Sequence, residues 1–114
     1  MSQNKEIMER AYRAGIAIPA FNIPYLPMMR PVVRAVRDCD AFAFIAVARL
    51  EWIKFEAKSL EDVAETWRQV GDPSCTRLHL DHVPVIDEDN LHVEVAPVFE
   101  RAIKAGFESL MVDG

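Results

Sequence analysis

The chain carries, at residues 76–84, the stretch Thr76-Arg77-Leu78-His79-Leu80-Asp81-His82-Val83-Pro84. Because successive side chains of a β-strand point to opposite faces, a strand over 76–81 places His79 and Asp81 on one face and the leucines on the other. His82 comes next, where we expect this strand to give way to a loop. A carboxylate beside a histidine at the end of a strand suits metal-assisted acid–base chemistry. We therefore interpret the stretch as half of an active site, and expect the other half to lie outside this chain.

Apolar runs and amphipathic segments alternate on either side of this stretch. Residues 41–48 are all apolar, which is typical of a strand buried on both faces in a parallel sheet. We expect further apolar strands at 16–23 and 107–112. The spacing of apolar residues predicts helices over residues 3–14, 26–38, 60–70 and 94–105. Strands that alternate with helices imply right-handed crossovers and a parallel sheet, and therefore an α/β fold.

Two of the predicted connections carry charged residues. In residues 49–58, Arg49 and Glu51 can reach a substrate phosphate or each other, and we favour a surface ion pair between them. Residues 82–93 form a long loop whose acidic cluster at 87–89 we expect to be solvated, although it can approach a cation. Ser59 then begins a helix as its N-cap, with Asp62 three residues later as its partner in a capping box.

Length, composition and charge exclude several classes of protein. The chain has 114 residues, enough for one domain with an apolar core, and its net charge of −5 provides no basic surface for nucleic acid or an anionic membrane. No apolar run approaches the roughly 18 residues of a membrane-spanning helix. Cys39 and Cys75 fit no Cys-x-x-Cys pattern, so we expect small, buried, reduced thiols. With a polar N-terminus unlike a signal peptide, these features favour a soluble, cytoplasmic protein.

The number of β/α units indicates a partial barrel. A barrel of eight such units takes about 250 residues, and this chain supplies about four strands. It also stops on an apolar strand, which would leave an exposed edge that invites aggregation. We therefore expect residues 1–114 to form the N-terminal half of a TIM barrel that is incomplete at its C-terminus.

Three segments, in this order, are similar to class II, zinc-dependent fructose-bisphosphate aldolases and their tagatose-bisphosphate relatives. Residues 19–23, Pro-Ala-Phe-Asn-Ile, resemble the first strand of that family. His79-Leu80-Asp81-His82 resembles its third-strand signature, and residues 105–114 resemble the end of a helix and the fourth strand. The resemblance covers nearly the whole chain, but only the N-terminal half of a family member.

The resemblance implies a fold, a reaction and site residues. The family folds as a TIM barrel and cleaves a phosphorylated ketose, reversibly, to dihydroxyacetone phosphate and an aldehyde. It implies that His82 is a zinc ligand, that Asp81 is the catalytic acid/base and that Asn22 binds substrate. Asp113 would have a supporting role near the metal. We expect His79, from its place on the strand, to be a supporting residue that orients its neighbours. It also implies a phosphorylated sugar as substrate and a homo-oligomer for the full-length protein.

Departures from the family pattern leave alternatives open. Val83-Pro84 follows the signature where the family has a small residue, and Ala46-Val47-Ala48-Arg49 replaces a region where many members carry a substrate-binding serine. The two later zinc histidines of the family lie beyond this chain, whereas catalytic zinc takes three protein ligands. One alternative is therefore a non-catalytic truncated or half-barrel fragment that pairs with a partner. Another keeps the barrel and the metal but changes the reaction.

Overall fold

A computed structural model describes residues 3–113. Met1, Ser2 and Gly114, which belong to the domain predicted over 1–114, lie outside the described residues. The elements follow one another as α1 (Gln3–Ala14), β1 (Ala20–Asn22), the short 3₁₀ helix η1 (Leu26–Met28), α2 (Met29–Asp38), β2 (Ala43–Ala48), α3 (Arg49–Ile53), α4 (Leu60–Val70), β3 (Thr76–Pro84), α5 (Val95–Ala105) and β4 (Ser109–Asp113).

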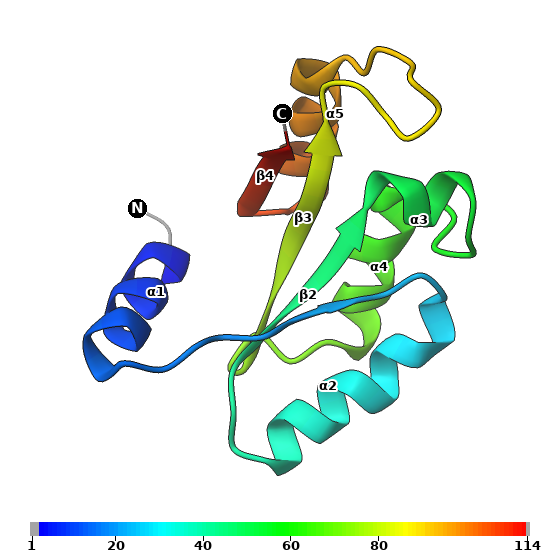
Figure 1. Cartoon of the computed structure of the whole chain (residues 1–114). Helices are drawn as coiled ribbons and strands as arrows, with labels where there is room; N and C mark the ends of the chain where they lie inside the picture. The colour runs from blue at the N-terminus through cyan, green and yellow to red at the C-terminus, as the bar shows by residue number, and fades with distance from the viewer. Residues whose placement is uncertain (1–2, 114) are drawn as a thin grey trace.

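The four strands form one parallel sheet in the order β1-β2-β3-β4 (Figure 1). Each strand therefore pairs with the next one along the chain, and helices fill each connection. This is the predicted α/β pattern of consecutive β/α units, consistent with part of a TIM barrel. Because all four strands run the same way, their C-terminal ends meet at one edge of the sheet.

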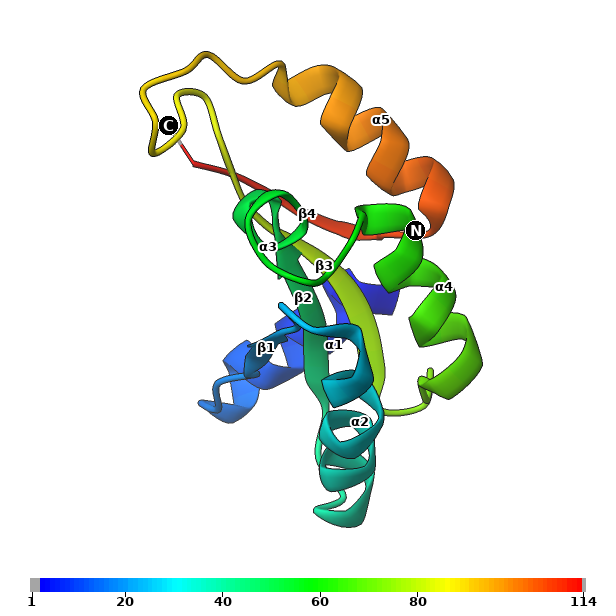
Figure 2. The same ribbon diagram turned by 90° about the vertical axis from the view of Figure 1, so that its right-hand side faces the viewer.

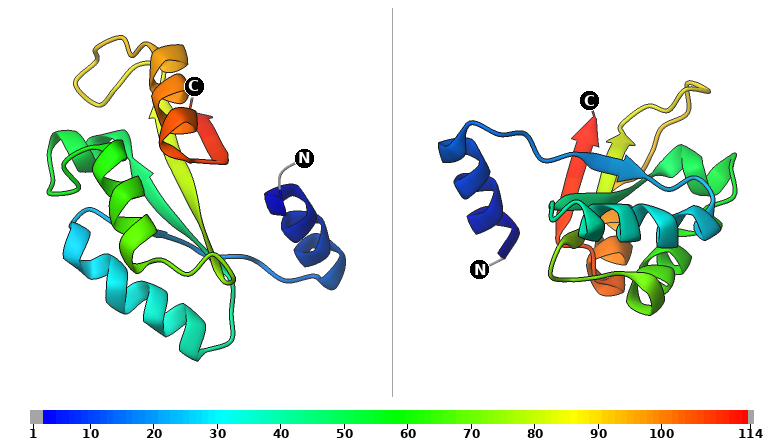
Figure 3. Two further views of the ribbon diagram at one scale, coloured as in Figure 1. Left: turned by 180° about the vertical axis from the view of Figure 1, so that it is seen from behind. Right: turned by 90° about the horizontal axis from the view of Figure 1, so that it is seen from below.

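Alternation gives the sheet two different faces, as predicted. Leu78 and Leu80 of β3 are buried in the apolar core, whereas His79 and Asp81, which alternate with them, are only partly buried. The core lies between the sheet and α2, α4 and α5, which lie on the same side of it (Figures 2 and 3). α1 lies apart from these helices, and its Gln3 accepts a 2.7 Å hydrogen bond from Arg77 at the start of β3. The face that carries His79 and Asp81 is thus not covered by α2, α4 or α5.

The helix boundaries follow local capping chemistry. Ser59 caps α4 as predicted, since its hydroxyl oxygen accepts a 3.0 Å hydrogen bond from the Asp62 N–H. The Asp62 carboxylate accepts from the Ser59 hydroxyl at 2.8 Å, while the Ser59 N–H donates to the Ala57 carbonyl. Pro97 is the third residue of α5, in the first turn where proline is tolerated. Gly106 ends α5 with φ +112°, a conformation that favours glycine.

β1 is shorter and more exposed than predicted. We expected a buried strand over 16–23, but only Ala20–Asn22 is extended and paired, and all three residues are exposed. Pro19 has no N–H to donate, although its carbonyl still accepts a 2.9 Å hydrogen bond from Phe44 of β2. Within residues 3–113, β1 has a neighbour on one side only, which leaves its other side open.

β3 is longer than predicted. The expected loop at 82–84 is instead strand, and the pairing with β4 shifts register between Leu80 and Val83. His82 sits in this bulge with φ +41°, in the left-handed region that non-glycine residues rarely adopt. After the bulge, β3 again points an apolar side chain into the core, since Val83 is fully buried. Proline is tolerated at Pro84 because it lies at the end of the strand.

Two further expectations differ from the structure. The mixed connection after β2 contains the short helix α3, which the sequence pattern did not indicate. Cys75 is a buried free thiol as expected, but Cys39 is exposed, because it follows α2 at the surface. Among the helices of residues 3–113, none has the length and apolar character needed to cross a bilayer.

Candidate active site

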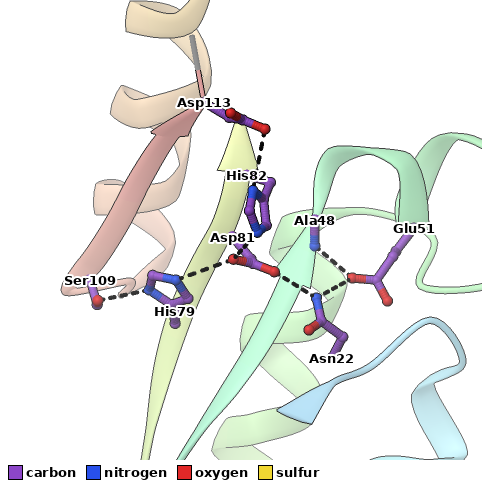
Figure 4. Close-up of polar contacts among 8 residues, drawn as sticks. All are labelled: Asn22, Ala48, Glu51, His79, Asp81, His82, Ser109 and Asp113. Carbon is purple, nitrogen blue, oxygen red and sulfur yellow. Dashed lines mark hydrogen bonds and ion pairs between the residues drawn. The ribbon is translucent and has the colours of Figure 1, made fainter. Parts of the chain in front are cut away.

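Polar side chains meet at the C-terminal edge of the sheet (Figure 4). Asn22 is the last residue of β1, Asp81 and His82 lie near the end of β3, and Asp113 ends β4. Glu51 joins them from the first turn of α3. Parallel strands place residues distant in sequence side by side at this edge, where the active sites of β/α barrels lie.

Asp81 lies at the centre of the cluster. Its Oδ2 accepts a 3.1 Å hydrogen bond from Asn22 Nδ2. Its Oδ1 lies 3.4 Å from Nε2 of His82 and 3.6 Å from Nε2 of His79. The Asp81 side chain is 15% exposed, so the carboxylate is open to a ligand yet held from both sides.

His82 bridges two strands. Its Nδ1 lies 3.3 Å from Oδ2 of Asp113 on β4, while its Nε2 faces Asp81. The ring is 57% exposed, much more than that of His79, because the bulge in β3 moves it out of the regular alternation. An accessible imidazole whose Nδ1 has a carboxylate partner suits metal ligation through Nε2, since such a partner orients the ring.

His79 supports Asp81 from the opposite side. Its Nδ1 lies 2.7 Å from the Ser109 hydroxyl oxygen on β4, and its Nε2 faces Oδ1 of Asp81. Burial lowers the pKa of His79 below its usual value, and the Asp81 charge opposes this effect without reversing it. The neutral imidazole is therefore favoured, and its single ring proton can be directed at either Ser109 or Asp81.

Glu51 is a site residue that the sequence interpretation misplaced. We expected a surface ion pair between Arg49 and Glu51, and that prediction is wrong. The Glu51 residue is only 8% exposed, and its Oε1 accepts hydrogen bonds from the Ala48 N–H at 2.7 Å and from Asn22 Nδ2 at 2.8 Å. Helical positions two residues apart do not face each other, and α3 turns the two charged side chains toward different partners.

Arg49 instead pairs with the acidic loop. Its Nη1 lies 3.2 Å from Oδ2 of Asp87, whose side chain is only 4% exposed. Oδ1 of Asp87 accepts from the N–H groups of Asp89 and Leu91. These bonds and the Arg49 charge lower the pKa of the Asp87 carboxyl, so it stays ionised. The expectation of a solvated cluster is therefore wrong for Asp87, which anchors the loop.

The cluster at 87–89 has cationic partners of its own. Within residues 3–113, Asp87, Glu88 and Asp89 form the one group of three metal-type ligands whose donor atoms lie within 4.8 Å of one another. Lys54 lies 3.0 Å from Asp89 and 4.0 Å from Glu88, and Arg49 pairs with Asp87. Two protein cations thus already offset most of the negative charge of these three carboxylates.

The donor chemistry at His82 fits part of a zinc site. Zinc takes imidazole nitrogen and carboxylate oxygen, and both are present in His82 and its neighbour Asp113. Among the residues that the structure describes, His82 is the one accessible imidazole of the cluster, because His79 is occupied by Ser109 and Asp81. A complete catalytic site, with three protein ligands, needs donors from additional chain.

The structure brings all five predicted site residues together. Asn22 and His82 contact Asp81 directly, His79 faces it, and Asp113 contacts His82. The sequence interpretation missed Glu51 and Ser109, which hold Asn22 and His79. A signal existed for Ser109, because it opens β4 opposite His79 in the register of the parallel sheet.

Comparison with known proteins identifies the family of this chain. The family model for fructose-bisphosphate aldolase class-II matches residues 2–114. D-tagatose-1,6-bisphosphate aldolase subunit GatY of Klebsiella oxytoca is 27% identical over 97% of this chain and 35% of its own length. Fructose-bisphosphate aldolase of Pseudomonas aeruginosa is 25% identical over 96% of this chain and 28% of its own length. The chain thus spans about a third of these relatives, and it belongs to the class II fructose-bisphosphate aldolase family.

Proposed function

We propose that this chain provides the N-terminal β/α units of a zinc-dependent aldolase. The reaction is the reversible cleavage of a phosphorylated ketose to dihydroxyacetone phosphate and an aldehyde. The observation that carries the proposal is the contact chain from Asn22 through Asp81 and His82 to Asp113 across the C-terminal ends of β1, β3 and β4. Catalysis requires additional chain, because these residues supply only part of a metal site.

Asp81 is the proposed acid/base. In cleavage it accepts the proton of the hydroxyl on the carbon that becomes the aldehyde, while the adjacent carbon–carbon bond breaks and its electron pair passes to the ketone fragment. In synthesis it returns that proton to the aldehyde oxygen. Asn22 and His79 hold its carboxylate in one orientation. Asn22 also lies where its carbonyl oxygen can accept a hydrogen bond from a substrate hydroxyl.

His82 is the proposed metal ligand. Asp113 contacts its Nδ1, orients the ring and fixes which nitrogen carries the proton. Zinc, when bound, supplies a Lewis acid that polarises the substrate carbonyl and stabilises the negative charge that develops after cleavage.

The substrate class is a ketose bisphosphate. The two relatives are named for tagatose 1,6-bisphosphate and for fructose bisphosphate, and these two sugars differ in the configuration at one carbon. Ala48 ends β2 in the region where many family members carry a serine, so this chain offers no side-chain hydroxyl there. Both substrates therefore belong in the assay.

The test uses the protein produced from its own gene. We expect bound zinc by elemental analysis and cleavage of at least one of the two bisphosphates in a coupled assay. D81N should keep its zinc but lose about a hundredfold or more in kcat/KM. H82A should lose both zinc and cleavage. H92A, which removes an exposed histidine of the acidic loop, is the control and should match the parent. Cleavage by D81N at the parent rate would contradict the proposal.

A second candidate is a non-catalytic half-barrel that pairs with a partner. The specific observation in its favour is that β1 and β4 form the two edges of the described sheet, with Phe21, Met111 and Val112 exposed on them. A purified protein that binds no zinc, cleaves neither bisphosphate and is recovered with a partner would establish this function. For the full-length enzyme we propose a cytoplasmic homo-oligomer.

A further inference from the structure

We infer that Glu51 is a positioning residue for the reaction, acting on Asp81 through the amide of Asn22. The inference rests on the proposed aldolase function, in which Asp81 moves the proton. Glu51, Asn22 and Asp81 come from α3, β1 and β3, so the link joins three consecutive β/α units (Figure 4). Glu51 itself is bonded to Asn22 and Ala48, and it therefore acts on the Asp81 carboxylate through Asn22.

The first step concerns the orientation of the Asn22 amide. Its Nδ2 lies 2.8 Å from Oε1 of Glu51 and 3.1 Å from Oδ2 of Asp81. Ionised carboxylates only accept hydrogen bonds, so two of them around one end of the amide require the NH₂ group there. The flipped amide would place its carbonyl oxygen against two carboxylate oxygens and would lose both bonds. Glu51 thus selects one of the two amide orientations.

The second step concerns the effect of this amide orientation on Asp81 and on substrate binding. With both amide protons directed at carboxylates, Asn22 donates to Oδ2 of Asp81 and leaves Oδ1 facing His79 and His82. The Asn22 carbonyl oxygen is then the end of the amide available to a substrate hydroxyl. Loss of Glu51 removes one of the two acceptors that fix the amide, and the remaining single bond to Asp81 allows it to rotate.

The third step concerns Glu51 itself. It is a nearly buried carboxylate, and burial of a charge is costly unless it is hydrogen-bonded. Its two donors, the Ala48 N–H and the Asn22 amide, meet at the same oxygen, Oε1. The Ala48 N–H is fixed by the backbone at the end of β2. Glu51 therefore ties the Asn22 amide to a rigid point of the sheet.

The kinetic test is a double-mutant cycle on cleavage by the whole protein. E51A and N22A should each lower kcat/KM by about tenfold to a hundredfold, as small displacements of catalytic groups do. Adding E51A to N22A should cost less than about twofold more, because Glu51 then has no amide to hold. Equal losses from E51A with and without Asn22 would overturn the inference.

A spectroscopic readout separates positioning from general stability. The chain has three asparagines, Asn4, Asn22 and Asn90, so spectra of protein labelled with ¹⁵N-asparagine are simple, and N22A identifies the Asn22 side-chain signals. We expect those amide protons to exchange slowly in the parent protein and faster in E51A. E51Q keeps an acceptor oxygen and should restore slow exchange. E51D, which keeps a carboxylate in the first turn of α3 but is one methylene shorter, replaces E51A if that variant does not fold.

E61A is the matched control, because it removes a carboxylate that pairs with Arg101 on the helical side of the molecule. It should change neither the Asn22 signals nor kcat/KM. Unchanged Asn22 exchange in both E51A and E51D would overturn the inference even if the protein is an aldolase. If the parent protein cleaves no ketose bisphosphate, the aldolase proposal fails, and a role in catalysis fails with it, whatever the exchange data show.

Discussion

At the scale of single residues, both carboxylate oxygens of Asp81 have partners within the cluster. Asn22 bonds one oxygen, and two imidazoles face the other. Two of these partners have side-chain hydrogen bonds of their own: Asn22 to Glu51, and His79 to Ser109. A proton-transfer group needs a fixed orientation before substrate arrives, and such outer contacts commonly provide it.

Burial of His79 makes stability depend on pH in a defined direction. Its folded-state pKa is lowered from 6.5, so the unfolded chain binds the proton more readily. Its contribution to stability is present above 6.5 and is lost as pH falls through the folded-state pKa. We expect the free energy of unfolding, measured with urea in metal-free protein, to fall more steeply over this window in the parent than in H79Q. The other titrating groups are common to both proteins, so equal slopes would contradict the assignment.

The backbone at His82 predicts a second effect. With φ +41°, an L-residue at this bulge is strained, whereas glycine is not. In metal-free protein we therefore expect H82G to be more stable than H82A by about 1 kcal/mol. Both variants should lose zinc equally. Urea denaturation measures the difference, and equal stability of the two variants would show that the bulge relaxes without cost.

The site residues that lie together in one sequence motif were predictable from the sequence. The third-strand signature contains Asp81 and His82 together, and strand alternation placed His79 beside them correctly. Glu51 was not predictable in this way, because its partner Asn22 lies 29 residues away and the contact depends on a short helix with no amphipathic pattern. Neither residue carries a local signal for a buried side-chain pair.

At the scale of elements, α4 offers a direct test of capping. S59A removes the hydroxyl that accepts from the Asp62 N–H, and we expect a loss of about 1 kcal/mol in the free energy of unfolding. T66A in the middle of the same helix removes a hydroxyl that bonds only to the Asp62 carbonyl, and alanine is the better helix former there. T66A should therefore be neutral or slightly stabilising. A smaller loss for S59A than for T66A would be inconsistent with the cap.

Elements with strong periodicity were predicted well, and short or interrupted ones were not. α4 and α5 have apolar residues at helical spacing, and β2 lies in a continuous apolar run of the length of a strand. β1 was overestimated, because an apolar segment looks the same whether it lies inside a sheet or at its edge. β3 was underestimated, since His82 and Pro84 resemble a loop, and the bulge that accommodates His82 has no sequence signature of its own.

At the scale of the whole molecule, the sheet formed by residues 3–113 has an open edge on each side. β1 and β4 each pair with one strand only among residues 3–113, and Val112 of β4 is 54% exposed. In a closed barrel each of these edges pairs with another strand, and closure removes the risk of intermolecular pairing. The relatives, about three times as long as the matched region, have additional chain for such strands.

A polypeptide of these 114 residues alone should therefore self-associate. Free strand edges with apolar side chains pair with other chains, and a charge on the edge opposes this. We expect sedimentation velocity to show association that increases with concentration, and V112K to weaken it about tenfold. I103K introduces the same charge at a residue of α5 that is 59% exposed, away from either edge, and should leave association unchanged. A monomer at every concentration would mean that the edges are protected without further strands, and an equal effect of both lysines would mean that net charge, rather than edge pairing, controls association.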